Sequence, residues 1–328
     1  MKDVALARPG DARSHTGAAA APTRRSGAFS GLRRGETLAG YLFLLPNLIG
    51  FLIFSLVPII ATFGLTLTDW NLVGERTFVG LENYGKLIGD ELFWKTARNT
   101  VTYTLGAVPA GVFIAFWLAL LLNRKMRGVV FFRTVFFLPY VTLTVAIAIV
   151  WAWIYHPELG LLNYLLGLVG IGRIDWLKDP TWIKPAIAVV AIWRAFGWNT
   201  VIYLAGLQSI PPDLYEAARV DGAGWFQVFR HITLPLLRPV ITFTAILTII
   251  GALQLFEEPL IIAGGASYSS ASPGGTGGAG LTVMVNLYNT AFNYVQFGYA
   301  ATMSVALFLI IVVFSFLYNR FLGGDATE

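Results

Sequence analysis

Six separate stretches of this sequence are apolar for long enough to cross a lipid bilayer as helices. They lie near residues 38–67, 98–123, 129–155, 184–206, 239–263 and 297–319. The hydrocarbon layer of a bilayer is ~30 Å thick, and about 20 apolar residues in helical form cross it. Because 56% of the 328 residues are hydrophobic and only 12% are charged, a water-soluble core could not enclose this much apolar surface. The sequence therefore predicts an all-α, polytopic membrane protein with six transmembrane helices.

The lysines and arginines outside these stretches predict how the chain is oriented. If the N-terminus is cytoplasmic, fifteen of them fall on the cytoplasmic side and seven on the other side. Positive residues are enriched in the cytoplasmic loops of membrane proteins. Both termini are therefore expected in the cytoplasm. Since the basic residues serve this purpose, the net charge of +5 does not indicate a nucleic-acid partner.

The segments between and around the spans predict the domain organisation. Residues 1–36 are rich in Ala, Gly, Arg and Ser and are expected to form a disordered cytoplasmic leader. A cleaved targeting peptide is the alternative, but the apolar stretch that follows is too long for one. Residues 37–322 are expected to form the six-helix transmembrane domain, in which residues 207–238 are a cytoplasmic loop, and residues 323–328 a cytoplasmic tail. The glycine- and serine-rich tract between the fifth and sixth spans is expected to be a mobile loop.

Several kinds of site are not expected in this chain. It has no cysteine, and its three histidines are far apart in the sequence, so neither a thiolate nor a multi-histidine metal centre is expected. No GxxxxGK[ST] segment occurs, so the chain is expected to have no ATPase site of its own. An enzyme is not predicted: Asp175 and Asp179 are acidic residues of an external segment, but they lack supporting catalytic partners.

The segment EAARVDGAGWFQVFRHITLPLLRP, residues 216–239, is a compact block of charges, glycines and prolines between apolar stretches. Pro211 and Pro212 suit the first turn of a helix, and Asp213 with Glu216 resembles a capping box. Asp221-Gly222 predicts a turn. A second short amphipathic helix is expected to follow and to end at TLPLLRP. Its apolar side, expected against the membrane domain, comprises Trp225, Phe226, Val228, Phe229 and Ile232.

Two interpretations of this loop are consistent with its residues. It is either a projection offered to a partner, with small side chains at Ala217 and Ala218 allowing close approach, or an ordered cover for the helix ends. The spacing Glu216-Ala217-Ala218, three residues, Gly222, nine residues, Ile232, one residue, Leu234-Pro235 resembles the cytoplasmic EAA motif of permease subunits in binding-protein-dependent ABC importers. Other segments resemble the carbohydrate branch of that family, the maltose and glycerol phosphate type, over residues 38–322. They include FLLPNLIGFLIFSLVPIIATFGLTLTDW, FFLPYV, WRAFGWNTVIYLAGLQSIP and AFNYVQFGYAATMSVALF.

The resemblance implies a type I ABC importer permease fold and a set of partners. These are a second permease subunit forming a heterodimer, two ATP-binding subunits that hold ATP and Mg, and an extracytoplasmic solute-binding protein. This chain would bind no cofactor itself, and it would lie in the cytoplasmic (inner) membrane of a bacterium or archaeon. The loop would dock into a cleft of the ATPase. The residues that the resemblance implies for this coupling are Glu216, Ala217, Ala218, Asp221 and Gly222.

Polar residues inside the spans are the candidates for a solute pathway, because ionisable groups at membrane depth are costly unless they are paired or hydrated. Arg194 is expected near the middle of the fourth span, and Glu257 and Glu258 in the outer half of the fifth. Gln254 is expected on the face of Glu258. Asn199 shares part of the side of Arg194, and the rings of Trp193 and Trp198 could stack on sugar faces.

Other interpretations of these groups remain open. An ion pair of Arg194 with Glu257 or Glu258 could simply fix two helices, or Arg194 could lie at the membrane interface. The whole chain could also be an ion-coupled secondary carrier or a channel for a polar solute, although no clear internal repeat is present. Prolines that could bend the spans are Pro46, Pro58, Pro109, Pro139 and Pro259.

Overall fold

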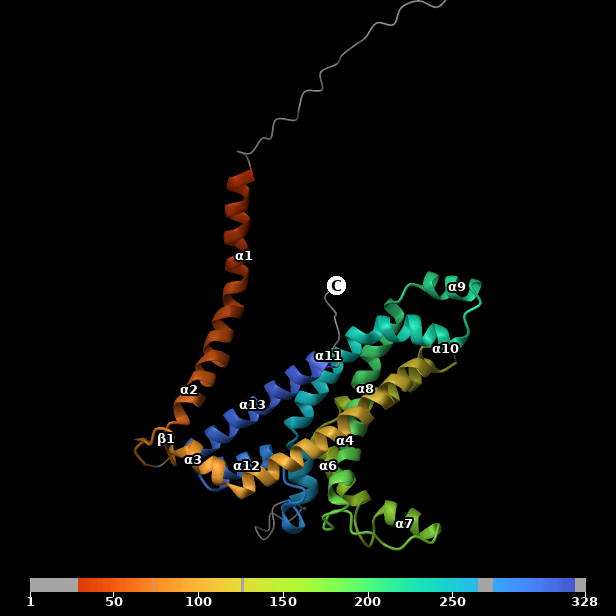
Figure 1. Ribbon diagram of the computed structural model, residues 1–328. Coiled ribbons are helices and arrows are strands. Elements are labelled where there is room, and N and C mark those ends of the chain that lie inside the picture. The colour runs from red at the N-terminus through yellow and green to blue at the C-terminus, as the bar shows by residue number, and fades with distance from the viewer. Residues whose placement is uncertain (1–28, 73, 125–126, 265–273, 322–328) are drawn as a thin grey trace, which may run out of the picture. The chain divides into compact units, whose positions relative to one another are not determined.

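Helices make up nearly all of the structure. The computed structural model describes residues 29–72, 74–124, 127–264 and 274–321 (Figure 1). The chain divides into two compact units, Met1–Ile59 and Ile60–Glu328. Within the described ranges the only strands are β1 (Thr68–Asp69) and β2 (Thr77–Phe78), which pair antiparallel. The prediction of an all-α protein is therefore confirmed.

The described part of the first unit, residues 29–59, is one long helix. α1 (Phe29–Phe51) continues through a π-helical turn, η1 (Leu52–Leu56), into α2 (Val57–Leu65), whose residues from Ile60 onward belong to the second unit. The π turn precedes Pro58, which has no N–H to donate. Residues Thr37–Leu65 are long and apolar enough to cross a membrane, so the first predicted span is confirmed.

Part of the predicted leader is helical. Because α1 begins at Phe29, residues 29–36 are not disordered, and this part of the prediction is wrong. The rest of the predicted leader, residues 1–28, and the predicted tail, residues 323–328, lie outside the described residues.

The second unit holds the other apolar helices. When the bent pair is counted as one span, the described part of the chain contains six candidate spans, as predicted. Three spans of the second unit are single helices: α4 (Glu91–Leu122), α8 (Ile183–Ser209) and α13 (Phe297–Phe321). A fourth is the bent pair of α5 (Val129–Val141) and α6 (Thr144–Ile154). The last is the continuous helix Trp225–Leu253, which consists of α10 (Trp225–Val228), η2 (Phe229–Thr233) and α11 (Leu234–Leu253).

The third predicted span, 129–155, is not one straight helix. α5 and α6 meet at 97°. The two residues between them, Thr142 and Leu143, have ψ angles of 146° and 121°, outside the helical region. Pro139 in the last turn of α5 cannot donate to the carbonyl one turn earlier. Thr142 donates to the carbonyl of Leu138 from both its N–H, at 3.1 Å, and its Oγ1, at 2.8 Å, so its side chain reinforces the last backbone bond of α5.

The fifth predicted span, 239–263, is also interrupted. α11 ends at Leu253, and one helical turn at Glu257 leads into η3 (Pro259–Ala263). Since Pro259 has no N–H, the carbonyl of Leu255 loses its helical partner. That carbonyl instead accepts a hydrogen bond from Thr282 Oγ1 at 2.8 Å. The break therefore has a specific cause, and its free backbone group is bonded to another segment.

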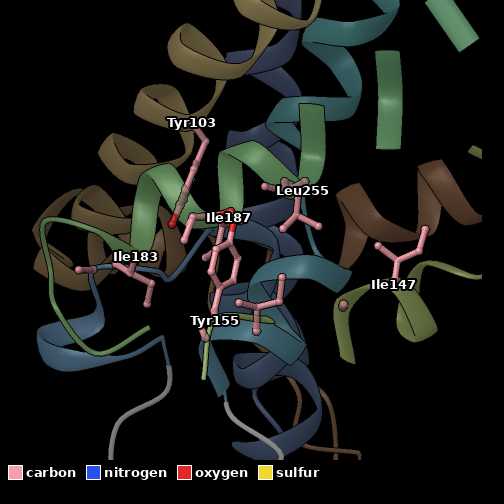
Figure 2. Close-up of a cluster of buried hydrophobic side chains, with 12 residues drawn as sticks. Tyr103, Ile147, Tyr155, Ile183, Ile187 and Leu255 are labelled. Carbon is pink, nitrogen blue, oxygen red and sulfur yellow. Dashed lines mark hydrogen bonds between the residues drawn. The ribbon is translucent and has the colours of Figure 1, made fainter. Parts of the chain in front are cut away.

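Side chains from several helices form the cores of the second unit. On α4, Ala115 and Ala119 are fully buried against α8, and their small size lets the two helices approach closely. A second core is shown in Figure 2, where Tyr103 of α4, Ile147 of α6 and Ile187 of α8 belong to one apolar cluster. In the same cluster Tyr155 donates its hydroxyl to the carbonyl of Ala186 at 3.0 Å.

Short elements occupy two opposite ends of the second unit (Figure 1). α9 (Pro212–Val220) and α10 lie at one end, whereas α3 (Glu82–Gly89), α7 (Leu161–Leu168) and α12 (Val283–Tyr288) lie at the other. Two further turns, η4 (Thr276–Gly278) and η5 (Asn289–Asn293), follow the fifth span. The membrane spans connect the two ends.

The described part of the glycine-rich tract, residues 274–280, is packed, so the prediction of a mobile loop is wrong for it. Asn99 of α4 donates its amide to the carbonyls of Gly278 at 3.1 Å and Leu281 at 3.0 Å, and Lys95 donates to the carbonyl of Gly277. A Cβ on Gly280 would lie 2.7 Å from Ile183 Cδ1. The glycines therefore permit close packing here. Residues 265–273 of the tract lie outside the described residues.

We expect Asn99→Ala to loosen this segment. The variant removes both amide bonds from a buried position, and leaving buried carbonyls without a partner costs about 1–3 kcal/mol. Hydrogen exchange of residues 274–283 should become about tenfold faster or more. Thr102→Ala is the matched control, because Thr102 is exposed and bonds only within its own helix. Equal exchange rates in both variants would contradict the role of Asn99.

Candidate functional site

The loop between α8 and α11 starts with a short helix that has no side-chain cap. The N-cap of α9 is Pro211, and Pro212 occupies the first helical position, as the two prolines predict. The predicted capping box of Asp213 and Glu216 is wrong. Both residues lie inside the helix, where Asp213 is in the first turn and its charge is favourable toward the helix dipole.

The turn after α9 is the one that Asp221-Gly222 predicts. Gly222 has φ of +76°, and the N–H of Ala223 bonds the carbonyl of Ala218 at 2.9 Å while that of Gly222 bonds the carbonyl of Arg219 at 3.1 Å. This pair of bonds around a left-handed residue is a Schellman motif. A Cβ on Gly222 would meet nothing within 4 Å. Glycine is therefore required by the backbone angle, and the surface over it is open.

The helix after this turn does not end before the fifth span. Gly224 N–H bonds Gln227 Oε1 at 2.8 Å, and from Trp225 the helix runs without a break through η2 to Leu253. The prediction of a separate second helix ending at TLPLLRP is wrong. Pro235 lies in the first turn of α11, directly after the π turn η2, and the helix continues through it. The end of the loop and the fifth span are thus one continuous helix.

Aromatic rings attach the loop to the membrane helices. Phe229 stacks on Trp117 of α4 at a centroid distance of 6.1 Å and on Trp225 at 5.5 Å. Tyr215 and Thr233 contact each other through their hydroxyls at 3.3 Å, which joins α9 to η2. Contrary to the prediction, Trp225 and Phe226 are each 61% exposed, because the ring of Phe229 already fills the space against α4.

The five residues expected to couple this loop to a partner are accessible. Glu216, Ala217, Asp221 and Gly222 are exposed, and Ala218 is half-buried. No ion pair of Glu216 occurs within the described ranges. Val220, which the sequence did not single out, is 89% exposed. Its signal in the sequence is an apolar residue between charged neighbours at a predicted helix end.

The polar residues of the spans form one close ion pair. Arg194 Nε of α8 lies 2.7 Å from Glu258 Oε1, at the helical turn after the break in the fifth span. The Glu258 side chain is 2% exposed and that of Arg194 30%. The predicted pair is confirmed with Glu258, whereas Glu257 is exposed. Arg194 therefore lies within the helix bundle.

A pocket of about 330 Å³ opens beside Arg194, between α4, α5, α8 and α11. Its polar lining includes Asn199, whose amide donates to Thr248 Oγ1 at 3.1 Å. Trp198 also lines it and stacks on Tyr140 with a centroid distance of 4.9 Å and an interplanar angle of 18°. An aromatic face with a guanidinium, an amide and a hydroxyl can hold a molecule that carries several hydroxyl groups.

Some predicted residues lie outside this pocket, and two of the hydroxyl-bearing residues that line it were missed. Trp193 packs edge-on against Trp151 at 5.7 Å. Gln254 is exposed and does not share a helix face with Glu258, because the helix is broken between them. Neither Gln254 nor Glu257 lines the pocket. Thr248 was missed, and so was Tyr140, although Tyr140 belongs to the segment FFLPYV.

Known proteins resemble this chain over most of its length. The sequence model of the family described as binding-protein-dependent transport system inner membrane component matches residues 107–322. The trehalose/maltose transport system permease protein MalF of Thermococcus litoralis is 33% identical over 292 residues, which are 89% of this chain and 96% of that protein. The lactose transport system permease protein LacF of Rhizobium radiobacter is 37% identical over 291 residues, 88% and 95% of the two chains.

A solved structure has the same fold. It is that of a bacterial alginate ABC transporter in complex with an alginate pentasaccharide-bound periplasmic protein. The TM-score is 0.74 with 25% identity, and the match covers 90% of this chain and 98% of that chain. Since the family model matches residues 107–322 and relatives above 30% identity cover most of the sequence, the chain belongs to the family of inner-membrane permease components of binding-protein-dependent ABC importers.

Proposed function

We propose that this permease subunit passes a sugar or sugar-like solute from an extracytoplasmic binding protein into the cytoplasm. The relatives named above carry trehalose/maltose or lactose by their names. The observation that carries the proposal for this chain is its pocket, in which Arg194, Asn199 and the stacked ring of Trp198 surround one space. Sugars have apolar ring faces and many hydroxyls, which suit aromatic rings and hydrogen-bonding side chains.

The loop end of the second unit is proposed to face the cytoplasm and to contact the ATPase. This orientation rests on the excess of Lys and Arg at that end. Two ATP-binding subunits would hold ATP and Mg, and this chain would hold neither. Two observations support the segment from Glu216 to Gly222 as the docking surface. Most of its residues are exposed, and within the described ranges the carboxylate of Glu216 forms no ion pair, so it can pair with a cation of the ATPase. A second permease subunit would complete the pathway.

The domain boundaries enter the same proposal. Residues 37–322 are proposed as the permease domain, with residues 1–36 before it and residues 323–328 after it on the cytoplasmic side. An even number of spans between the two termini supports this arrangement.

Co-purification and uptake test the proposed function together. We expect the tagged chain, expressed with its partner subunits, to bring down an ATPase. Uptake of the sugar held by the cognate binding protein should stop when ATP is depleted, with the ion gradients kept intact. Uptake that continues without ATP but stops when the gradients are removed would show an ion-coupled carrier instead.

A further inference from the structure

The segment around α7 is apolar on its outer side. From Leu159 to Gly172 the sequence contains no Asp, Glu, Lys, Arg or His. Leu159 is 87% exposed, and Leu161, Tyr164, Leu165, Leu168 and Val169 are exposed as well. In water such a surface would be unfavourable, because the free-energy cost of hydrating apolar side chains is roughly proportional to their exposed area.

The inner side of the same segment is firmly held. The Asn163 amide nitrogen donates to the carbonyls of Pro157 at 3.0 Å and Ile174 at 2.8 Å. Its carbonyl oxygen accepts from the Ile174 N–H at 3.3 Å and from Trp176 Nε1 at 3.0 Å. Leu162 packs against the core cluster of Figure 2. The outward direction of the apolar side is therefore fixed by the fold.

The bent third span explains why an apolar helix is needed at this place. α5 has 13 residues and α6 has 11, and they meet at 97°. At 1.5 Å per residue these two helices together reach only about 24 Å from end to end. The hydrocarbon layer is ~30 Å thick. α6 therefore ends within the layer or at its edge, and α7 begins only a few residues later.

We propose that α7 lies in the membrane interface, with its outer side inserted among the lipids of the leaflet at this end of the molecule. α7 contacts α6, on which Val150 and Trp153 are exposed as well. Charged residues flank the segment, with Glu158 before it and Arg173 after it. Tyr164 supplies a ring with a hydroxyl, a side chain suited to the headgroup level. An interfacial helix of this kind completes the short span.

Spin labelling tests this placement, and the absence of cysteine in the chain makes single-site labelling direct. Leu165→Cys and Leu168→Cys are labelled with a nitroxide in the complete transporter, in vesicles of phosphatidylethanolamine and phosphatidylglycerol. Collision rates with oxygen, which enriches in lipid, should exceed those with a nickel(II) chelate, which stays in water, several-fold. Arg173→Cys, at the polar end, should show the reverse order, and the inward-facing Leu162→Cys should show low rates with both.

Two results would overturn the proposal. A higher rate with the nickel chelate at both outer positions would place α7 in water. Low rates with both reagents, as at Leu162, would place it against protein, such as the second permease. Val169→Cys carrying a fluorophore gives an independent measurement, because lipids with brominated chains should quench it. Neither measurement requires transport, so the result does not depend on the solute proposed above. The proposed orientation of the chain decides only whether α7 lies in the outer or the inner leaflet.

Discussion

Gly222→Asp is expected to abolish transport while the chain still inserts into the membrane. The glycine holds φ of +76° in the Schellman turn, and a side chain with a Cβ costs about 1–2 kcal/mol in this conformation. The variant also places a charge on a surface that is open in the free subunit, where a Cβ would meet nothing within 4 Å. If the ATPase approaches this surface, uptake should fall below about a tenth of the wild-type rate.

Two further substitutions, at residues 224 and 222, separate the effect of the turn from that of a blocked surface. Gly224→Ala is the matched control: Gly224 is also exposed, but its φ is −71°, so alanine is accepted and uptake should stay near wild type. Gly222→Asn adds an uncharged side chain of similar size, and asparagine, like aspartate, enters the left-handed region more readily than most residues. Loss of uptake in Gly222→Asn would assign the effect to a blocked partner surface. Full uptake in Gly222→Asp, with normal amounts of protein, would contradict the coupling role.

The turn was predictable from sequence, but the helix after it was not. The pair Asp221-Gly222 indicates a turn because only glycine adopts the required angle readily. The period of the apolar residues places Trp225, Phe226 and Phe229 on roughly one side. It does not say that Phe229 alone reaches Trp117 of α4, more than a hundred residues earlier. Which of the three rings is buried therefore depends on a contact with α4, and the local sequence does not specify that contact.

The six spans were predictable because each needs only length and apolar composition, whereas their bends were not. Pro46 lies inside α1 and Pro109 inside α4 without a break, but breaks occur near Pro139 and Pro259. All four prolines free a carbonyl group. Whether the helix breaks depends on the groups that satisfy that carbonyl. At Leu255 the partner is Thr282, from a later segment.

The same limit applies to the polar pocket. Arg194 and Glu258 were singled out because ionisable groups are costly inside a membrane, and the structure pairs them. Tyr140 was missed because its ring meets Trp198 from another helix. Gln254 was wrongly placed because helical spacing was assumed across a break. The sequence therefore predicted which residue types carry the site better than it predicted their neighbours.

The ion pair offers the second large effect, and its two halves should behave differently. Arg194→Ala leaves a carboxylate that is 2% exposed without its cation, and breaking a buried pair in this way costs about 3–5 kcal/mol. Glu258→Ala leaves a guanidinium that is 30% exposed beside the pocket, where water can reach it. We therefore expect the yield and the Tm of the assembled complex to fall further in Arg194→Ala than in Glu258→Ala.

The double variant Arg194→Met/Glu258→Gln then separates a structural pair from a solute contact. It removes both charges and keeps side chains of similar length, so assembly should return to within about 1–2 kcal/mol of wild type. If the Arg194 guanidinium contacts the solute in the pocket, uptake in proteoliposomes stays lost although the complex is intact. Glu257→Gln, at the exposed neighbouring position, should leave both measurements unchanged. Recovery of uptake together with assembly would mean that the pair only holds α8 against the turn before η3, and the pathway would then depend on Asn199, Thr248 and the rings of Tyr140 and Trp198.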